Sequence, residues 1–143
     1  MMQDLHNHIK CSLAEPPVAA LTNANTPYVS TILDTAGFGS AEFVGILGTN
    51  TDADVTFTVL VEDGDDSGLS DAAAVADAFL LGVEAMGLDF ADDNSVFKIG
   101  YIGPKRYVRV TVTPANNGAG DVFFAAAWIQ GHPRVGPQST QVI

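Results

Sequence analysis

Residues 54–62, DVTFTVLVE, give the clearest indication of the fold, because their apolar and polar side chains alternate. The residues on one side are Val55, Phe57, Val59 and Val61. Successive side chains of a β-strand point to opposite faces, so this pattern predicts a strand with one buried face. The stretch RYVRVTVTP, residues 106–114, repeats the pattern, and Val96–Ile102 alternates as well. With Gly103-Pro104-Lys105 as a turn between them, the sequence predicts a β-hairpin over residues 96–114.

Further short strands are predicted along the chain at residues 4–11, 28–33, 41–47 and 122–130. Within the third of these, Gly45 indicates a bulge or a close backbone approach. The last, VFFAAAWIQ, is so apolar that it is expected either to be buried on both faces or to lie in an interface. Several short strands separated by turn residues predict an all-β fold with one domain, residues 1–143, shaped as a β-sandwich or a barrel-like body.

Residues 70–86 fit two structures. Their apolar positions follow helical spacing with Ser70 as the cap, and they are Ala72, Val75, Ala76, Phe79, Leu80, Val83 and Met86. Gly82 interrupts that spacing, and the same residues also fit a strand, a turn and a second strand. One short helix within 70–86 is therefore one of two alternatives.

Two segments, residues 12–27 and 131–143, are predicted to be extended arms, because their prolines interrupt both helices and strand pairing. Both arms nevertheless carry apolar side chains, namely Leu13, Val18, Leu21, Val135, Val142 and Ile143. Exposure of these side chains to water is unfavourable, so at least one arm is expected to order against a neighbouring protein.

The chain is strongly acidic, with 17 Asp and Glu against 6 Lys and Arg and a net charge of −11. Phosphate backbones repel such a chain, so no nucleic-acid partner is expected. No apolar run approaches the ~20 residues of a membrane span, and the first ten residues do not resemble a signal peptide. The protein is therefore expected to be made in the cytoplasm, with no membrane partner. Its single cysteine, Cys11, excludes an internal disulfide and is expected to be buried.

The sequence predicts no catalytic, metal or cofactor site. Neither a nucleophile elbow nor a glycine-rich phosphate loop occurs, so the chain is not expected to be an enzyme. His6 and His8 share one face of a predicted strand, but no further zinc ligand is suitably spaced. The loop Asp63–Gly68 begins like a calcium loop and continues to Asp71. Ala74 stands where that loop needs a bidentate Glu, so a solvated acidic turn is favoured.

Four of the six basic residues lie on the predicted hairpin, and they are Lys98, Lys105, Arg106 and Arg109. They are expected to pair with the chain's own acids, and docking to an acidic partner is the alternative. Arg106 and Arg109 fall on opposite strand faces and form no single patch. The residues predicted to contact a partner are Lys105, Arg106 and Arg109 of the hairpin and Leu13, Val18, Leu21, Val135 and Ile143 of the arms.

Four stretches carry a likeness to a known family. They are MQDLHNHIK (residues 2–10), LSDAAAVADAFLLG (69–82), FADDNSVFKIGYIGPKRYVRVTVTPANN (90–117) and AWIQGHPRVGP (127–137). Together they resemble the capsid decoration proteins, also called cement or head-stabilising proteins, of tailed bacteriophages. The likeness covers most of the chain as a pattern, without a chemical motif, and it favours β structure for residues 72–86.

The resemblance implies a structural virion protein on the outer capsid surface. Its implied partner is the major capsid protein, and its copies are expected to associate, with a trimer favoured. Two alternatives stay open: another virion part, such as a tail-tube or head-completion protein, and a carbohydrate-binding β-sandwich module. Sugar binders usually present aromatic rings at the surface, whereas Trp128 lies in an apolar strand and Phe123 and Phe124 are predicted to be core residues.

Overall fold

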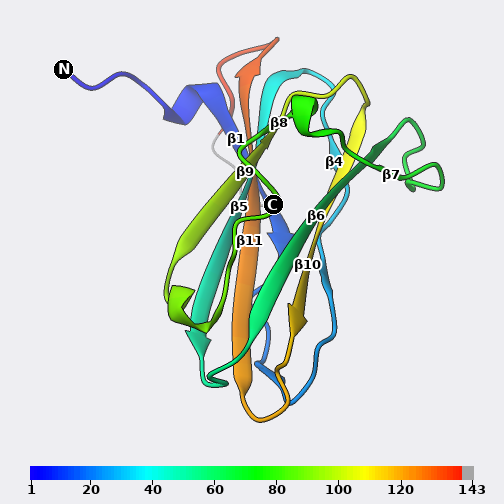
Figure 1. The fold of residues 1–143 in the computed structure, drawn as a ribbon. Helices are drawn as coiled ribbons and strands as arrows, with labels where there is room; N and C mark the ends of the chain where they lie inside the picture. The colour runs from blue at the N-terminus through cyan, green and yellow to red at the C-terminus, as the bar shows by residue number, and fades with distance from the viewer. Residues whose placement is uncertain (140–143) are drawn as a thin grey trace.

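Two antiparallel β-sheets packed face to face make up the computed structural model, which describes residues 1–139 (Figure 1). In pairing order, the larger sheet contains β1 (Ile9–Glu15), β11 (Asp121–Pro133), β5 (Phe38–Asn50), β9 (Val96–Tyr101) and β8 (Leu80–Leu81), and β2 (Leu21–Thr22) also pairs with β11. The smaller sheet contains β3 (Tyr28–Val29), β4 (Leu33–Asp34), β10 (Tyr107–Ala115), β6 (Thr56–Gly64) and β7 (Ala73–Ala74). Three single-turn 3₁₀ helices are η1 (His6–His8), η2 (Asp77–Phe79) and η3 (Phe90–Asp92). The predicted all-β sandwich is confirmed.

The core lies between the sheets and is filled by every second residue of the long strands. Its most buried large side chains include Phe43, Leu47, Ile99, Trp128, Val61, Val108, Val110 and Val112. The alternation in residues 54–62 is confirmed, since β6 buries Phe57, Val59 and Val61. Gly45 does mark a close approach, but the neighbour is a side chain, because a Cβ there would collide with the Phe97 ring.

The predicted hairpin over residues 96–114 is wrong. Strand β9 pairs with β5 and β8 in the larger sheet, whereas β10 pairs with β6 in the smaller one. The intervening residues cross between the layers and are held by the Tyr101 hydroxyl, which donates to Asp63 (2.7 Å) and accepts from the Lys105 backbone N–H (3.0 Å). Alternation specifies an inner face for each strand, but it does not specify the sheet to which the strand belongs.

Two other predicted strands differ in the structure. The first strand begins at Ile9, because residues 6–8 form the turn η1. The predicted strand 28–33 is split into β3 and β4, which both pair with β10 on either side of Ser30. The Ser30 hydroxyl accepts a hydrogen bond from the Val110 backbone N–H (2.9 Å). The Ser30 backbone N–H in turn donates to the Val110 carbonyl (2.9 Å).

Residues 70–86 contain β7, η2 and β8 and no α-helix. Val75 and Leu80 point into the core, whereas Phe79 and Val83 are exposed, so the helical spacing of apolar residues was coincidental. Gly82 adopts a φ of +100°, which a helix does not allow. No helix among the described residues is long and apolar enough to cross a membrane.

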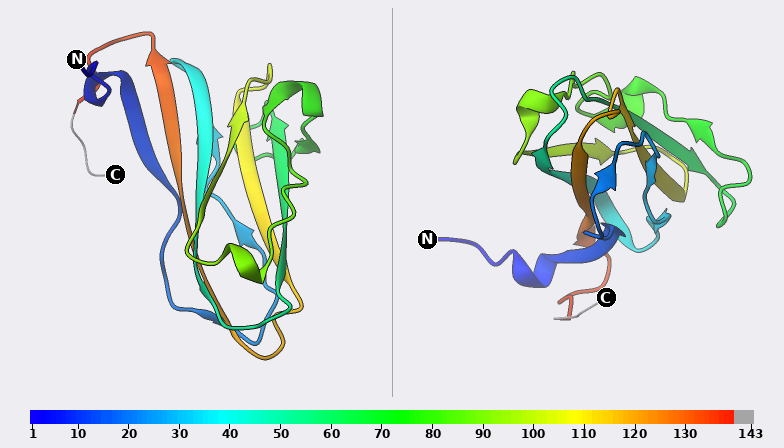
Figure 2. Two further views of the ribbon diagram at one scale, coloured as in Figure 1. Left: turned by 60° about the vertical axis from the view of Figure 1, so that its left-hand side comes forward. Right: turned by 90° about the horizontal axis from the view of Figure 1, so that it is seen from below.

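The two predicted arms are shorter than expected. Residues 12–15 belong to β1 and residues 131–133 to β11. Residues 1–8 and 134–139 lie at the same end of the sandwich (Figure 2), where the Gln138 N–H donates to the Asn7 carbonyl (2.8 Å). Cys11, predicted to be buried, is exposed because its position in β1 points outward.

Candidate functional site: an apolar outer sheet face

The outward side of the larger sheet is unusually apolar. Directly paired residues of neighbouring strands lie on the same side of a sheet. The register therefore places Leu13, Ala127, Val44 and Lys98 in one row across the sheet, and Ala125, Ile46 and Val96 in the next. We define the apolar face as Leu13, Val44, Ile46, Val96, Phe123, Ala125, Ala127 and Ile129.

Four large side chains of the apolar face are open to solvent. The exposed fraction is 66% for Val96, 46% for Ile46, 45% for Leu13 and 43% for Phe123. An antiparallel sheet with one solvated side usually carries polar residues there. The apolar face therefore lacks the polar side chains expected on a sheet surface that faces only water.

Two charged residues of opposite sign, Glu42 and Lys98, lie among the rows of the apolar face. The Glu42 carboxyl sits over Gly100, where a Cβ would come within 2.9 Å of its oxygen. Partial burial raises the pKa of Glu42, and the charge of Lys98 opposes that shift. Within these rows the two charges are equal and opposite, whereas the chain as a whole carries −11.

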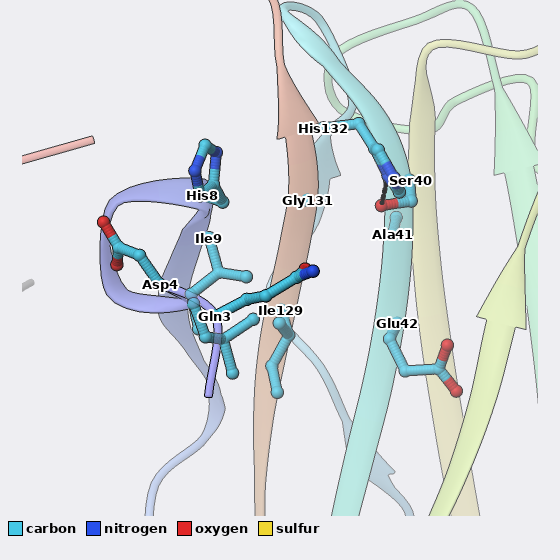
Figure 3. Close-up of a pocket in the computed structure, with 11 residues that line it drawn as sticks. Gln3, Asp4, His8, Ile9, Ser40, Ala41, Glu42, Ile129, Gly131 and His132 are labelled. Atoms are coloured by element: carbon cyan, nitrogen blue, oxygen red, sulfur yellow. Dashed lines mark hydrogen bonds between the residues drawn. The ribbon is translucent and has the colours of Figure 1, made fainter. Parts of the chain in front are cut away.

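A cleft of about 520 Å³ opens between one end of this sheet and the N-terminal segment (Figure 3). It is lined by Ala41, Ile129 and Gly131 of the sheet and by Leu5 and Ile9 near the N-terminus. Because Ile129 belongs to both, the cleft continues the apolar face toward the chain ends.

A serine–histidine pair lies on the rim of this cleft. Ser40 Oγ and His132 Nδ1 are 3.0 Å apart (Figure 3). His132 has a φ of +51°, an uncommon left-handed conformation. Within residues 1–139 no carboxylate hydrogen-bonds to His132, so the pair lacks the third group that orients the base of a nucleophilic triad.

A second groove borders the apolar face at Val18. It is lined by Pro17, Val18, Ile46, Gly48, Phe123, Phe124 and Ala125. Two of the predicted contact residues of the arms, Leu13 and Val18, are thereby brought to one surface. Leu21 instead packs partly buried against the core, and Val135 is exposed beyond β11.

The last predicted contact residue, Ile143, lies outside the described residues, as does Val142. Sequence reasoning missed Phe123, Ile46 and Val96 as surface residues. Phe123 was predicted to be core, but it points outward on β11 while its neighbour Phe124 points inward. Both sides of this strand are apolar, so its sequence holds no polar alternation to distinguish them.

The three predicted basic contact residues lie elsewhere, on or beside the smaller sheet, and each forms an ion pair within the chain. Lys105 contacts Asp65, and the guanidinium groups of Arg106 and Arg109 lie 2.8 Å from Asp34 and Glu62. Hydrogen bonding to Arg106 lowers the pKa of Asp34. The expected pairing with the chain's own acids is confirmed for these three, whereas Lys98 forms no ion pair within residues 1–139. The three paired cations are less available to a partner.

The acidic loop after β6 uses its carboxylates locally. Asp71 accepts the backbone N–H groups of Asp65 and Asp66, and Asp66 accepts those of Gly68 and Ser70. These backbone bonds lower the pKa of both carboxyls. No cluster of three or more metal-ligating side chains occurs within residues 1–139.

Comparisons with known proteins give structural similarity only. No protein-family model and no curated protein sequence matches the chain. Similar solved structures include the PBSX exported protein XepA, at 14% identity over 100% of this chain and 42% of that one, with a TM-score of 0.47. The capsid of equine rhinitis A virus, a picornavirus, shows 12% identity over 92% and 78% of the two chains, with a TM-score of 0.42.

The xylan-binding module CBM15 is similar to the same degree, at 9% identity over 93% of this chain and 96% of that one, with a TM-score of 0.42. Because the match covers 42% of XepA, the chain spans less than half the length of that protein. Similarities of this size transfer no function to the chain.

Proposed function

We propose that this protein is a non-enzymatic structural component of a tailed-phage virion that decorates the outer surface of the head and stabilises it. The observation that carries the proposal is the apolar face, an exposed surface suited to burial against protein. The phage assignment rests on the sequence resemblance, and the major capsid protein is the implied partner. The protein would be made in the host cytoplasm and end on the capsid surface.

Repetition on a lattice makes modest contacts sufficient. Leu13, Ile46, Val96 and Phe123 are each about half exposed, so covering one of them contributes roughly 1 kcal/mol. A single contact of this kind is weak, but copies that also touch one another are retained by multivalency.

The apolar face favours a protein partner over a sugar. Carbohydrate sites combine exposed aromatic rings with polar groups that fix orientation. On the apolar face Phe123 is the single aromatic residue, and its neighbours there are aliphatic. A sugar would leave this surface with few hydrogen bonds to make.

The test is co-sedimentation of the purified protein with phage heads stripped of it. Ile46→Asp places a charge on the apolar face and should weaken binding by at least about tenfold. Leu60→Asp is the matched control, because Leu60 is a strand residue of similar exposure, 40%, on the smaller sheet. Equal binding of both variants would remove the apolar face from the docking account, and no binding of the unmodified protein would overturn the proposal.

Truncations extend the same test to the chain ends. Deleting residues 1–8 or 134–143 removes the segments before β1 and after β11 and leaves both strands intact. At least one deletion should leave a folded body that binds heads more weakly. If both truncated proteins bind as tightly as the full chain, docking belongs to the β-sandwich body.

A further inference from the structure

We infer that the apolar face packs against the same face of a second copy, giving a two-fold dimer with the larger sheets back to back. This inference rests on the proposed function for the role of the apolar face. It adds which protein covers that face. It can be measured on the free protein, without phage particles.

The charges of this surface fit an identical partner. Glu42 and Lys98 are the two charged groups among the rows of the apolar face, and they have opposite signs. Two identical faces related by a two-fold axis are self-complementary, so Glu42 of each copy can approach Lys98 of the other. The strongly acidic loop Asp63–Asp71 belongs to the smaller sheet and stays away from such a contact (Figure 1).

The shape of the apolar face also fits packing against a second sheet. Ala125 and Ala127 form a low strip along β11, with Leu13 on one side and Val44 and Ile46 on the other. Larger side chains of a facing sheet can enter such a strip, and facing sheets pack about 10 Å apart with their strands within about 30° of alignment.

The area suits a weak, concentration-dependent dimer. Four strands ~4.8 Å apart, with outward residues over ~8 positions at ~3.3 Å each, give a flat area of roughly 500 Å² per copy. Two copies would bury roughly 1,000 Å², near the lower end of specific interfaces. Such a contact is marginal in dilute solution and is strengthened by the high local concentration on a capsid.

Sedimentation equilibrium from about 1 μM to about 500 μM covers the expected range of affinity. A monomer–dimer equilibrium is expected for the full chain and for Leu60→Asp, whereas Ile46→Asp should weaken it at least about 100-fold. A monomer throughout this range overturns the inference. A species of three chains also overturns it and favours the trimer that the sequence resemblance implies.

Charge reversal tests whether the partner is a second copy. Glu42→Lys and Lys98→Glu each place like charges across the two-fold contact and should weaken the dimer about tenfold. An equimolar mixture of the two variants brings opposite charges together and should restore the affinity to within about twofold. If the mixture associates no better than either variant alone, while both melt like the unmodified protein, the inference fails.

The two proposals fail separately. A protein that binds stripped heads but remains monomeric retains the proposed function and loses the dimer. A protein that dimerises through the apolar face but does not bind heads loses the proposed function and retains the dimer.

Discussion

The two sheets are alike on their inner faces and differ on their outer faces. Outward residues of the smaller sheet pair as Arg109 with Glu62, Thr111 with Leu60, and Thr113 with Thr58. The corresponding positions of the larger sheet carry the apolar face. Both sheets contribute Val and aromatic side chains to one shared core. The inner faces therefore account for the fold, and the outer faces distinguish a surface suited to water from one suited to protein.

The same comparison can be made within one strand. On β11, Trp128 is 1% exposed, sets its ring edge-on to Phe43 at 5.2 Å between centroids, and donates from Nε1 to the Thr31 carbonyl (3.1 Å). Phe123 belongs to the same strand but points outward. The contributions of a buried and an exposed aromatic ring of one strand can therefore be separated by single substitutions.

The largest effect is expected from Trp128→Ala, which should lower the free energy of unfolding by about 3–5 kcal/mol through loss of buried surface and a residual cavity. Phe123→Ala should cost less than about 1 kcal/mol in the isolated protein, because its ring is already half exposed. Urea unfolding of the two variants measures both values. Equal losses would contradict the distinction between the inward and outward sides of β11.

The next effect tests the polar bridge between the sheets. Tyr101→Phe removes the hydroxyl that bonds Asp63 and the Lys105 N–H, and should cost about 2 kcal/mol because Asp63 is left buried without this donor. Tyr107→Phe, at the start of β10, is the matched control and should be nearly neutral. A neutral Tyr101→Phe variant in thermal or urea unfolding would show that the bridge adds no stability.

A smaller effect is expected on the outer face of the smaller sheet. Arg109→Ala breaks the half-buried pair with Glu62 and should cost about 1 kcal/mol. Thr111→Ala, on the same strand and side, removes no ion pair and should cost less. Neither variant should alter sedimentation of the protein, because we place association on the larger sheet. A change in association with Arg109→Ala would contradict that placement.

The smallest effect concerns acid pH at the exposed Asp34–Arg106 pair. Arg106 lowers the pKa of Asp34 from its ordinary 3.8, so the ionised carboxylate stabilises the folded state. That stabilisation is complete above the ordinary value and is lost as the pH falls through the lowered one. In Arg106→Gln the loss of stability between about pH 6 and about pH 3 should be smaller, as chemical unfolding at both pH values would show. An unchanged loss would mean that the pair contributes nothing.

The sequence predicted the positions and inner faces of the main strands better than it predicted which strands pair with one another. The alternation in residues 54–62 and 106–114 correctly gave two strands with apolar inner faces. It could not show that β9 and β10 lie in different sheets, because that depends on distant partners. Residues 122–130 were expected to be buried on both faces or to lie in an interface, and within the chain only one side of β11 is buried.

The candidate site was predicted only in part. Leu13 and Val18 were identified because apolar side chains on Pro-rich arms would be unfavourably exposed to water, although Leu13 turned out to lie in a strand. Phe123 and Cys11 were expected to be buried from their residue types, yet each occupies an outward strand position. Orientation in a sheet follows from register, which a strand with two apolar sides does not reveal.

We propose that protein covers the outer side of the larger sheet when the chain is bound to the virion. A cryo-EM map of phage heads carrying this protein would show what covers that side. We expect density for the chain on the outer capsid surface, with Ile46, Val96 and Phe123 packed against another protein chain. Density in which the apolar face of every copy points into solvent, with the smaller sheet against the capsid, would rule this proposal out.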